Sequence, residues 1–337
     1  MILVTGGTGL VGSHLLFKLA QKNEKLRALY RPTSDLNQVR KIFGYYSEKA
    51  EADLLFNRIE WVTADITDVP ALNLAFENIT EVYHCAALIS FDPADERKLR
   101  KINIEGTANI VNQCIANKIK KLCYVSSIAA LGSTTNGKTI DENSKWNPEE
   151  QHNDYAISKY GAEIEVWRGT QEGITAVIVN PGVIIGPGFW NSGSGKIFSK
   201  IDKGLKYHFP KVTGFIGVKD VVRSMIALME SSLTNEQFII ISENISFEKV
   251  FRETANYMDR PEPTRKLKKW MIALAWVFQK TGSIFGRKRQ ITKDAIEGLH
   301  EETFYSNQKI KEKLNFDFTP ISQVLKNTSE LYTKDKS

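Results

Sequence analysis

Short apolar runs alternate along this chain with segments in which apolar residues recur at helical spacing. The apolar runs predict strands near residues 2–5, 26–30, 58–62, 81–85, 121–126 and 174–179. The segments between them predict helices near residues 10–22, 35–43, 70–77, 95–117 and 154–171. Strands and helices that alternate in this way indicate an α/β fold with a doubly wound parallel sheet.

A glycine cluster lies between the first predicted strand and the first predicted helix. Gly6 permits a tight turn, Gly9 lets the backbone approach a pyrophosphate, and Gly12 lets the helix pack closely on the strand. The free N–H groups at the start of the helix favour an anion there. The cluster therefore predicts a dinucleotide-binding loop, although its Gly-x-x-Gly-x-x-Gly spacing differs from the usual Gly-x-Gly-x-x-Gly.

Tyr155 and Lys159 are four residues apart in a predicted helix, so their side chains share one face. A nearby cation favours the ionised form of a phenol, and we therefore expect Lys159 to lower the pKa of Tyr155. Such a tyrosine can exchange a proton near neutral pH. Surface helices also carry this spacing by chance, but the glycine loop favours the catalytic interpretation.

The segment from Thr5 to Gly12, taken with Tyr155 and Lys159, resembles the extended short-chain dehydrogenase/reductase superfamily, that is, the NAD-dependent epimerase/dehydratase family. Five further segments match that family in order, over almost the whole chain: Ala64–Asp68, His84–Ala87, Asn103–Thr107, Val125–Ser127 and Asn180–Gly188. The last segment is similar to those of dihydroflavonol-4-reductase-like and 3β-hydroxysteroid-dehydrogenase-like proteins.

The resemblance implies a catalytic group of Ser127, Tyr155 and Lys159, with Ser126 more structural. Lys159 is expected to contact the nicotinamide ribose as well. Asn103 matches a residue that supports the lysine through water in the family, but an amide bonded to backbone is the interpretation we favour. The expected cofactor contacts are Thr5, Gly6, Gly9, Leu10, Val11, Gly12, Arg31, Asp65, Ile66, Ala86, Ala87, Tyr155, Lys159, Pro181 and Val183.

Arg31 indicates the type of cofactor. It stands after the second predicted strand, about twenty residues beyond the glycine loop, where NAD enzymes carry a carboxylate for the ribose 2′-OH. An arginine there accommodates a 2′-phosphate, so NADPH is favoured and NAD is the alternative. Thr33, Ser34 and the first N–H groups of the next helix are expected to assist. Arg31 extended along a strand edge, and Asp65 as a plain helix cap, are the structural alternatives.

The sequence also predicts two interleaved domains. The nucleotide-binding (Rossmann) domain is expected to consist of residues 1–183 and 214–242, because Val218–Glu230 and Gln237–Ile241 read as one more helix and strand of the sheet. A smaller α/β substrate-binding cap is expected from residues 184–213 and 243–337. Its first part, residues 189–196, is rich in glycine and predicts an irregular, mobile loop.

Composition narrows the functional class. The net charge of +6 is modest and the basic residues are scattered among acidic ones, which argues against nucleic acid as a partner. Cys85, Cys114 and Cys123 lack metal-ligand spacing, so we expect no metal and reduced thiols of a cytoplasmic protein. The first strand begins at Ile2, which leaves no room for a signal peptide.

These observations predict an NADPH-dependent oxidoreductase that reduces an aldehyde or ketone by hydride transfer, with Tyr155 as proton donor. Ile128 and Ala129 stand where sugar-nucleotide dehydratases carry an Asp-Glu pair, which argues against elimination. The alternatives are a sugar or nucleotide-sugar epimerase and a non-catalytic cofactor-binding sensor or assembly factor. The substrate is expected to be a small carbonyl or sugar-derived compound, in a pocket drawn from Leu88, Phe91, Phe189, Trp190 and Phe209.

An apolar stretch from Trp270 to Phe278, flanked by lysines, is shorter than the roughly 20 residues that span a bilayer. Three interpretations of residues 265–280 stay open: a cap helix over the substrate pocket, a contact in a homodimer, or a helix in peripheral contact with anionic lipid.

Overall fold

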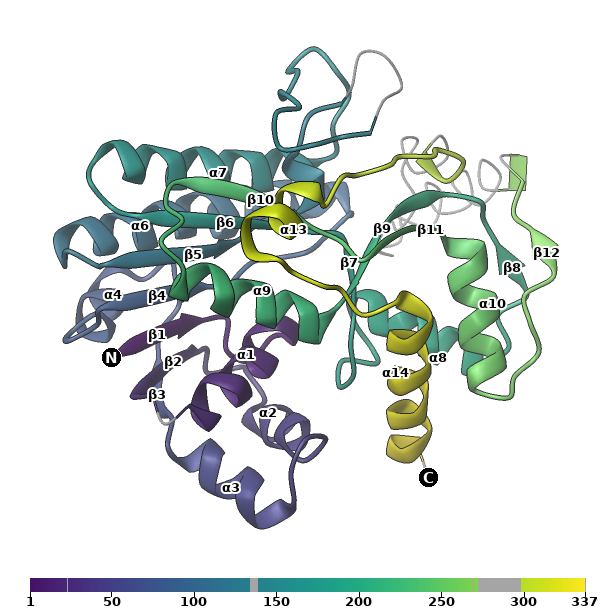
Figure 1. Cartoon of the computed structure of the whole chain (residues 1–337), viewed down its shortest axis with the longest axis horizontal. Coiled ribbons are helices and arrows are strands. Elements are labelled where there is room, and N and C mark those ends of the chain that lie inside the picture. The colour runs from purple at the N-terminus through teal and green to yellow at the C-terminus, as the bar shows by residue number, and fades with distance from the viewer. Residues whose placement is uncertain (23, 134–138, 269, 272–297, 337) are drawn as a thin grey trace.

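A central sheet of seven parallel strands organises the molecule (Figure 1). The computed structural model describes residues 1–22, 24–133, 139–268, 270–271 and 298–336. The strand order is β10-β6-β5-β4-β1-β2-β3. The strands are β1 (Ile2–Thr5), β2 (Leu26–Tyr30), β3 (Glu60–Thr63), β4 (Glu81–His84), β5 (Lys121–Val125), β6 (Ala176–Pro181) and β10 (Glu236–Ile240). The predicted doubly wound Rossmann sheet is confirmed, including the return of the last strand beside β6.

Helices cover both faces of this sheet, because alternate residues of each strand face opposite sides. Val4 and Tyr83 pack in one apolar cluster with the helices α1 (Leu10–Gln21), α2 (Leu36–Phe43), α3 (Lys49–Asn57) and α9 (Val218–Glu230). Leu3 and Tyr124 pack in a second cluster with α4 (Val69–Ala75), α6 (Gly106–Ala116) and α7 (Asp154–Gln171). The side chains of β5 that face α7 therefore include Tyr124.

Two parts of this unit differ from the sequence-based expectation. The sequence pattern predicts no helix or strand over residues 44–57. The structure has α3 there, and its Ala52, Leu55 and Phe56 are buried against the sheet. The helix predicted over 95–117 is divided. It consists of η1 (Pro93–Asp95), α5 (Glu96–Leu99), the π-helix η2 (Arg100–Glu105) and α6. π-Turns of this kind are frequent at functional sites, and this one carries Asn103.

A smaller group of elements lies beside the large sheet (Figure 1). Its three-stranded sheet has the order β11-β9-β7, and a two-stranded sheet pairs β12 with β8. These elements are β7 (Val183–Ile185), η4 (Gly193–Gly195), α8 (Lys196–Asp202), β8 (Tyr207–His208), β9 (Val212–Gly217), β11 (Glu243–Ser246), α10 (Phe247–Tyr257), β12 (Arg265–Lys266) and α14 (Ile321–Lys336). They share their own apolar cluster, centred on residues such as Phe198, Phe215 and Leu325.

The chain passes more than once between the large sheet and the smaller group of elements, as two interleaved domains require. The exact residue boundaries of the two domains stay a prediction. Helix α13 (Gln308–Leu314) contacts β10 of the large sheet, although its residues belong to the predicted cap. The predicted apolar helix 270–278 falls almost entirely outside the described residues, so its three interpretations stay open. Within the described residues, no helix has the length and apolarity needed to cross a membrane.

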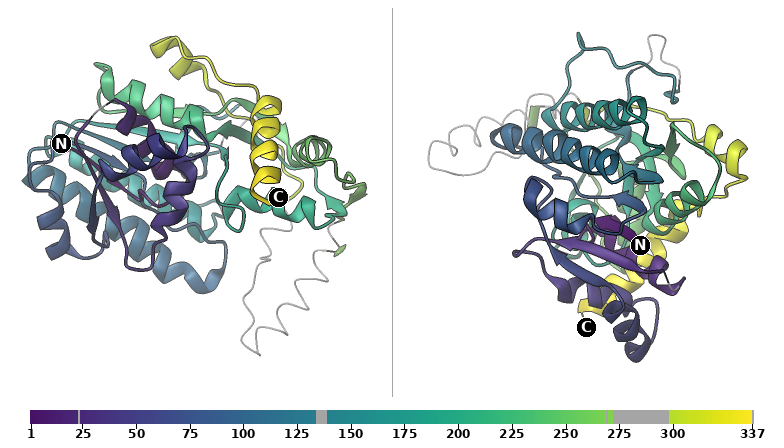
Figure 2. Two further views of the ribbon diagram at one scale, coloured as in Figure 1. Left: turned by 90° about the horizontal axis from the view of Figure 1, so that it is seen from below. Right: turned by 90° about the vertical axis from the view of Figure 1, so that its left-hand side faces the viewer.

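Helix α14 joins the two groups of elements (Figure 2). The carboxylate of Asp335 near its end accepts hydrogen bonds from Tyr45 of the large unit and from the Trp190 indole, the latter at 2.7 Å. Lys41 forms an ion pair with the same carboxylate at 2.9 Å. The Trp190 ring also packs against Tyr332, with ring centroids 5.0 Å apart. The Asp335 carboxylate therefore connects three segments that are distant in sequence: α14, the region of Lys41 and Tyr45, and the turn that contains Trp190.

We expect Asp335→Ala to lower the free energy of unfolding by about 1–3 kcal/mol, because three donors lose their acceptor. Urea denaturation followed by tryptophan fluorescence measures this loss. Glu330→Ala is the matched control, since Glu330 is exposed on the same helix. Equal stability of the two variants would show that the Asp335 contacts contribute nothing.

Candidate active site

The glycine loop after β1 has the conformation that a phosphate site requires. The chain turns at Gly6, where φ is +66°. A side chain at Gly12 would place its Cβ 2.2 Å from the Gly6 carbonyl oxygen, so only glycine fits there. Helix α1 starts after Gly9 without a side-chain cap and without an acidic residue in its first turn. Its first N–H groups therefore suit the pyrophosphate of a dinucleotide.

The ends of β1 and β4 meet beside this loop, at the point where the strand order reverses. Thr5 Oγ1 lies 2.6 Å from His84 Nδ1 and accepts the Ala86 N–H at 3.3 Å. A Cβ on Gly6 would lie 2.6 Å from the Ala86 nitrogen, so the two backbones are in close contact. Open α/β sheets bind their ligands at such a crossover.

Other predicted cofactor contacts surround the same edge of the sheet. Pro181 ends β6 and Val183 begins β7. Leu10 and Val11 form the first turn of α1. Asp65 and Ile66 follow β3. One carboxylate oxygen of Asp65 accepts both the N–H and the hydroxyl hydrogen of Thr67, at 2.9 and 2.7 Å, as a turn-capping aspartate does.

Arg31 follows β2 and its side chain is exposed. The turn it begins is tied to the glycine loop: Ser34 Oγ accepts the Arg31 N–H at 3.1 Å and the Thr8 hydroxyl hydrogen at 3.2 Å. The expectation that the N–H groups of α2 assist is wrong for Asn37. Its N–H already donates to the Asp35 carboxylate at 2.9 Å, because Asp35 caps the helix.

Lys159 is buried on the face of α7 that meets β5. Its Nζ donates to the Tyr124 hydroxyl at 2.7 Å and to the Val125 carbonyl at 2.8 Å. Only 1% of the residue is exposed. Burial lowers the pKa of Lys159 to about 7, while the acidic groups of Glu163 and Cys85 act in the opposite direction.

Tyr155 lies one turn earlier on α7, beside Ser127. Burial raises the pKa of Tyr155 to about 12, and a hydrogen bond with Ser127 opposes that shift. The expectation that the net shift of the Tyr155 pKa is downward is therefore wrong, because burial outweighs any effect of the nearby ammonium. Burial dominates, and the ammonium of Lys159 is directed to Tyr124 and Val125. A tyrosine in this state keeps its proton at neutral pH and is suited to donate it.

Ser126 and Ser127 differ in their surroundings. Ser127 Oγ accepts the Ala129 N–H at 3.1 Å, which leaves its own hydrogen for another acceptor. The Ser126 hydroxyl is buried and lies against the Glu163 carboxyl group. The structure thus brings Ser127 to Tyr155, and Ser126 to the interior behind it.

Asn103 binds backbone, as the favoured interpretation proposed. Its Oδ1 accepts the Leu88 N–H at 2.7 Å and its Nδ2 donates to the Leu88 carbonyl at 3.0 Å. The same Nδ2 donates to the Ser158 hydroxyl at 2.9 Å. The π-helix therefore holds the segment that follows β4 against α7.

Four of the five predicted pocket residues separate into two groups. Leu88 belongs to the segment held by Asn103, and the exposed ring of Phe91 lies edge-on to Tyr155, with centroids 5.6 Å apart. Trp190 and Phe209 instead pack inside the smaller unit, Phe209 against Phe247 with centroids 4.8 Å apart. Phe189 is half-buried at the start of the turn that leads to η4.

Sequence reasoning missed a buried polar chain behind Lys159. The Tyr124 hydroxyl also bonds to Thr107, whose Oγ1 lies 3.0 Å from His84 Nε2. Burial lowers the pKa of His84 to about 3, so the imidazole is neutral. It missed Glu163 as well, although this residue extends the four-residue spacing of Tyr155 and Lys159 by one more turn.

The parallel sheet and the glycine loop at its crossover are typical of a Rossmann-fold protein that binds a dinucleotide. The model of the NAD-dependent epimerase/dehydratase family matches residues 2–240. The chain therefore belongs to this family, whose members are extended short-chain dehydrogenase/reductase enzymes that include reductases and epimerases.

Individual relatives include both kinds of enzyme. A putative dihydroflavonol 4-reductase of Synechocystis is 28% identical over 334 residues, which cover 96% of this chain and 91% of the relative. A UDP-glucose 4-epimerase of Vibrio cholerae is 25% identical, with 85% of this chain and 82% of the relative covered. Among solved structures, gox2253 has a TM-score of 0.82 at 26% identity, with 99% and 98% of the two chains covered. A UDP-glucose 4-epimerase of Thermotoga maritima has a TM-score of 0.77 at 20% identity, with 100% of this chain and 99% of that chain covered.

Substitutions at two glycines of the loop can distinguish an effect on packing from an effect on cofactor binding. A Cβ at Gly9 would lie 3.4 Å from the Gly6 carbonyl oxygen, an ordinary contact, whereas one at Gly12 would clash. We expect Gly9→Ala to keep the thermal stability of the protein but to weaken binding of the reduced nicotinamide dinucleotide about tenfold or more, ~1.4 kcal/mol. Gly12→Ala is expected to lower stability itself. Thermal unfolding and fluorescence titration with NADH and NADPH measure the two effects, and full affinity of Gly9→Ala for the dinucleotide would contradict the assigned loop.

Proposed function

We propose that this protein is an NADPH-dependent reductase of aldehydes or ketones, with Ser127, Tyr155 and Lys159 as its catalytic group. The observation that carries the proposal is the position of Tyr155. Its protonated phenol bonds to Ser127 and lies beside the exposed Phe91, at the edge of the sheet where the glycine loop lies. A carbonyl oxygen placed between the two hydroxyl groups meets a proton donor and an orienting hydrogen bond at once.

The chemistry needs one hydride and one proton. A nicotinamide dinucleotide held at the glycine loop around Gly6 and Gly9 would supply the hydride to the carbonyl carbon. Tyr155 donates its phenolic proton to the carbonyl oxygen as negative charge develops there, and Ser127 donates a hydrogen bond to the same oxygen. Lys159 provides a positive charge one turn away, which favours the tyrosinate left after proton transfer until solvent restores the proton.

Apolar side chains near Tyr155 support a substrate with an apolar body. Ile89 and Phe91 are 61% and 60% exposed, and both lie in the segment that Asn103 holds next to α7. Ile128 and Ala129 follow Ser127, so the acidic pair that elimination requires is missing from that position. The relative named as a putative dihydroflavonol 4-reductase adds support, because that name denotes carbonyl reduction.

A nucleotide-sugar epimerase is the second candidate, supported by the relative from Vibrio cholerae that carries that name. The two functions differ in cofactor balance, because a reductase consumes NADPH with each turnover and an epimerase returns its cofactor to the starting state. Assays of an aldehyde and ketone panel with NADPH and NADH, beside interconversion assays of UDP-sugars, distinguish them.

Arg31 supports NADPH over NADH. It follows β2 in a turn whose Ser34 hydroxyl is bonded to the glycine loop, so a phosphate on the adenosine ribose would lie near its guanidinium. Arginine binds phosphate oxygens through two parallel N–H groups, which gives a strong, charge-assisted contact. Thr33 and Ser34 add hydroxyl groups in the same turn.

For the catalytic group, we expect Tyr155→Phe to lower turnover roughly 100-fold or more, since a general acid contributes on this scale. NADPH affinity should stay as in the unchanged protein, because only the phenolic oxygen is removed. Tyr160→Phe is the control: Tyr160 lies in the same helix, and its ring stacks on Trp146 of the preceding loop. Full turnover by Tyr155→Phe in a stopped-flow or steady-state assay would refute the mechanism.

For the cofactor, Arg31→Ala is expected to weaken NADPH more than NADH, because a charge-assisted hydrogen bond contributes about 1.5–3 kcal/mol. That energy corresponds to a loss of preference of roughly tenfold or more. Lys25→Ala, an exposed cation at the other end of β2, controls for overall charge. Equal affinity of the unchanged protein for both cofactors in fluorescence titrations would contradict the assignment.

A further inference from the structure

Glu163 is a buried carboxyl group with no part in the mechanism described above. It lies on α7 one turn after Lys159 and two turns after Tyr155, on the face that meets the sheet. Only 4% of the residue is exposed. A carboxyl group is almost never buried unless polar partners compensate it, so its position requires an explanation.

The partners of Glu163 connect it to the loop that carries Ser127. Asn180 Nδ2, at the end of β6, donates to Glu163 Oε1 at 2.6 Å. The same Nδ2 donates to the Ser127 carbonyl at 3.1 Å. The Ser126 hydroxyl lies against the Glu163 carboxyl group. One side chain of α7 is therefore coupled, through Asn180, to the backbone of the predicted catalytic serine.

The charges around Lys159 give Glu163 a second role. The titratable groups around the ammonium are His84 of β4, Cys85 directly after it, Tyr124 of β5, and Tyr155 and Glu163, which lie one turn to either side of Lys159 on α7. Burial lowers the pKa of His84 to about 3 and raises the pKa of Cys85, Tyr124 and Tyr155, so all four are neutral near pH 7. Of these described groups, Glu163 alone can supply a negative charge at neutral pH.

We propose that Glu163 is a positioning residue for the catalytic group: its carboxylate keeps the buried Lys159 protonated, and its bond to Asn180 holds the Ser127 peptide. The catalytic role of Glu163 rests on the proposed function. The electrostatic interaction between Glu163 and Lys159 does not depend on it, because both groups belong to this protein. Glu163 touches neither substrate nor cofactor in this account and acts through Lys159 and Ser127.

The pKa values agree with a coupled pair. Burial raises the pKa of Glu163 to about 7, and the Lys159 ammonium opposes that shift. Burial lowers the pKa of Lys159 to about 7, and the Glu163 carboxylate opposes that shift in turn. Removing the carboxylate removes the largest effect that opposes burial, so the pKa of Lys159 must fall further. Less of the ammonium then remains at neutral pH to bind a ribose or favour a tyrosinate.

The test is the titration of Lys159 in protein labelled with 13C at the lysine ε-carbon, with the signal assigned by its loss in Lys159→Arg. We expect Glu163→Gln to lower the titration midpoint of Lys159 by about one pH unit or more, a shift within the range that a lost neighbouring charge produces. Glutamine keeps the shape of the side chain and an acceptor for Asn180, so packing is conserved.

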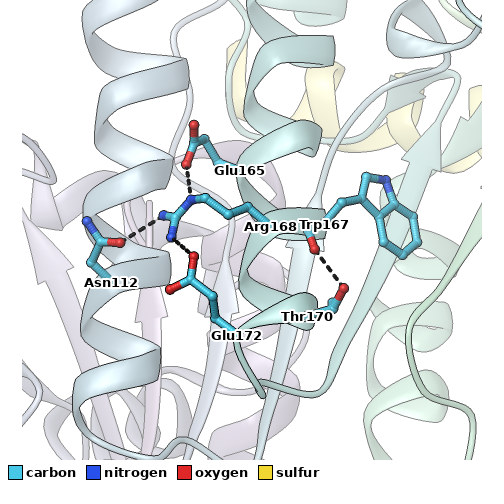
Figure 3. A network of polar contacts seen from close by, with 6 residues as sticks. All are labelled: Asn112, Glu165, Trp167, Arg168, Thr170 and Glu172. Atoms are coloured by element: carbon cyan, nitrogen blue, oxygen red, sulfur yellow. Dashed lines mark hydrogen bonds and ion pairs between the residues drawn. The ribbon is translucent and has the colours of Figure 1, made fainter.

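Glu165→Gln is the matched control. Glu165 lies on the same helix, but its carboxylate binds Arg168 at 2.8 Å in a network with Glu172 and Asn112 of α6 (Figure 3). Its neutralisation is expected to leave the Lys159 midpoint unchanged. An unchanged midpoint in Glu163→Gln, or an equal shift in both variants, would overturn the proposal.

A reciprocal measurement keeps the test decisive. If Glu163→Gln does not fold, the reciprocal variant Lys159→Met reports the same coupling. The Glu163 midpoint, read from 13C at the glutamate δ-carbon, is expected to rise without the cation, and an unchanged value overturns the proposal. None of these readouts requires a substrate. A failure to reduce any carbonyl compound would therefore count against the proposed reductase and not against the pairing of Glu163 with Lys159.

Discussion

The burial of one ammonium group constrains the whole active-site region. Moving a cation from water into a protein interior costs several kcal/mol unless acceptors and opposite charge compensate it. Lys159 obtains its acceptors from Tyr124 and from the Val125 carbonyl, both at the carboxyl end of β5. Helix α7 must therefore lie so that this residue meets β5. The same placement brings Tyr155 to Ser127, which follows that strand.

Close packing and a surface hydrogen bond hold α7 in this place. Gly161 and Gly169 face Ile104 and Val111, where any side chain would clash at 2.6–2.7 Å. On the outer side, Arg168 connects α7 to Asn112 of α6, as Figure 3 shows. Neither set of contacts involves the predicted catalytic residues directly. Their role is to keep the helix close to the sheet, on which the distance between Tyr155 and Ser127 depends.

The sequence predicted those parts of the structure that depend on residues close together in the chain. Alternating strands and helices, the glycine loop and the four-residue spacing of Tyr155 and Lys159 all depend on neighbours within a few residues, and the doubly wound sheet followed from them. The resemblance to the family then ordered the remaining segments. Helix α3 was missed because it is only 9 residues long and its large apolar residues are consecutive, Leu54 to Phe56, which is not a helical spacing. The three-stranded sheet was missed because its strands come from segments up to sixty residues apart, roughly 183–246, and pair only after folding.

In the candidate active site, too, features set by nearby residues were predictable and contacts between distant residues were not. Which residues come near Tyr155 was partly predictable, as Phe91 shows. The direction of the Lys159 ammonium was not, since it depends on Tyr124, a strand residue 35 positions earlier. Trp190 looked like a pocket residue because it is aromatic and follows a glycine-rich turn, yet its indole bonds to Asp335 at the other end of the chain. Contacts of this kind depend on tertiary structure, and no single-sequence pattern carries them.

The central claim is that this site transfers a hydride from NADPH to a carbonyl carbon while Tyr155 protonates the oxygen. NADPH that carries deuterium at the reactive C4 position, incubated with the panel of aldehydes and ketones, tests it directly by mass spectrometry of the products. The account predicts an alcohol with one deuterium on the former carbonyl carbon, formed by the unchanged protein and absent with Tyr155→Phe. Products without deuterium from every carbonyl compound, together with conversion of UDP-glucose to its 4-epimer, would contradict it.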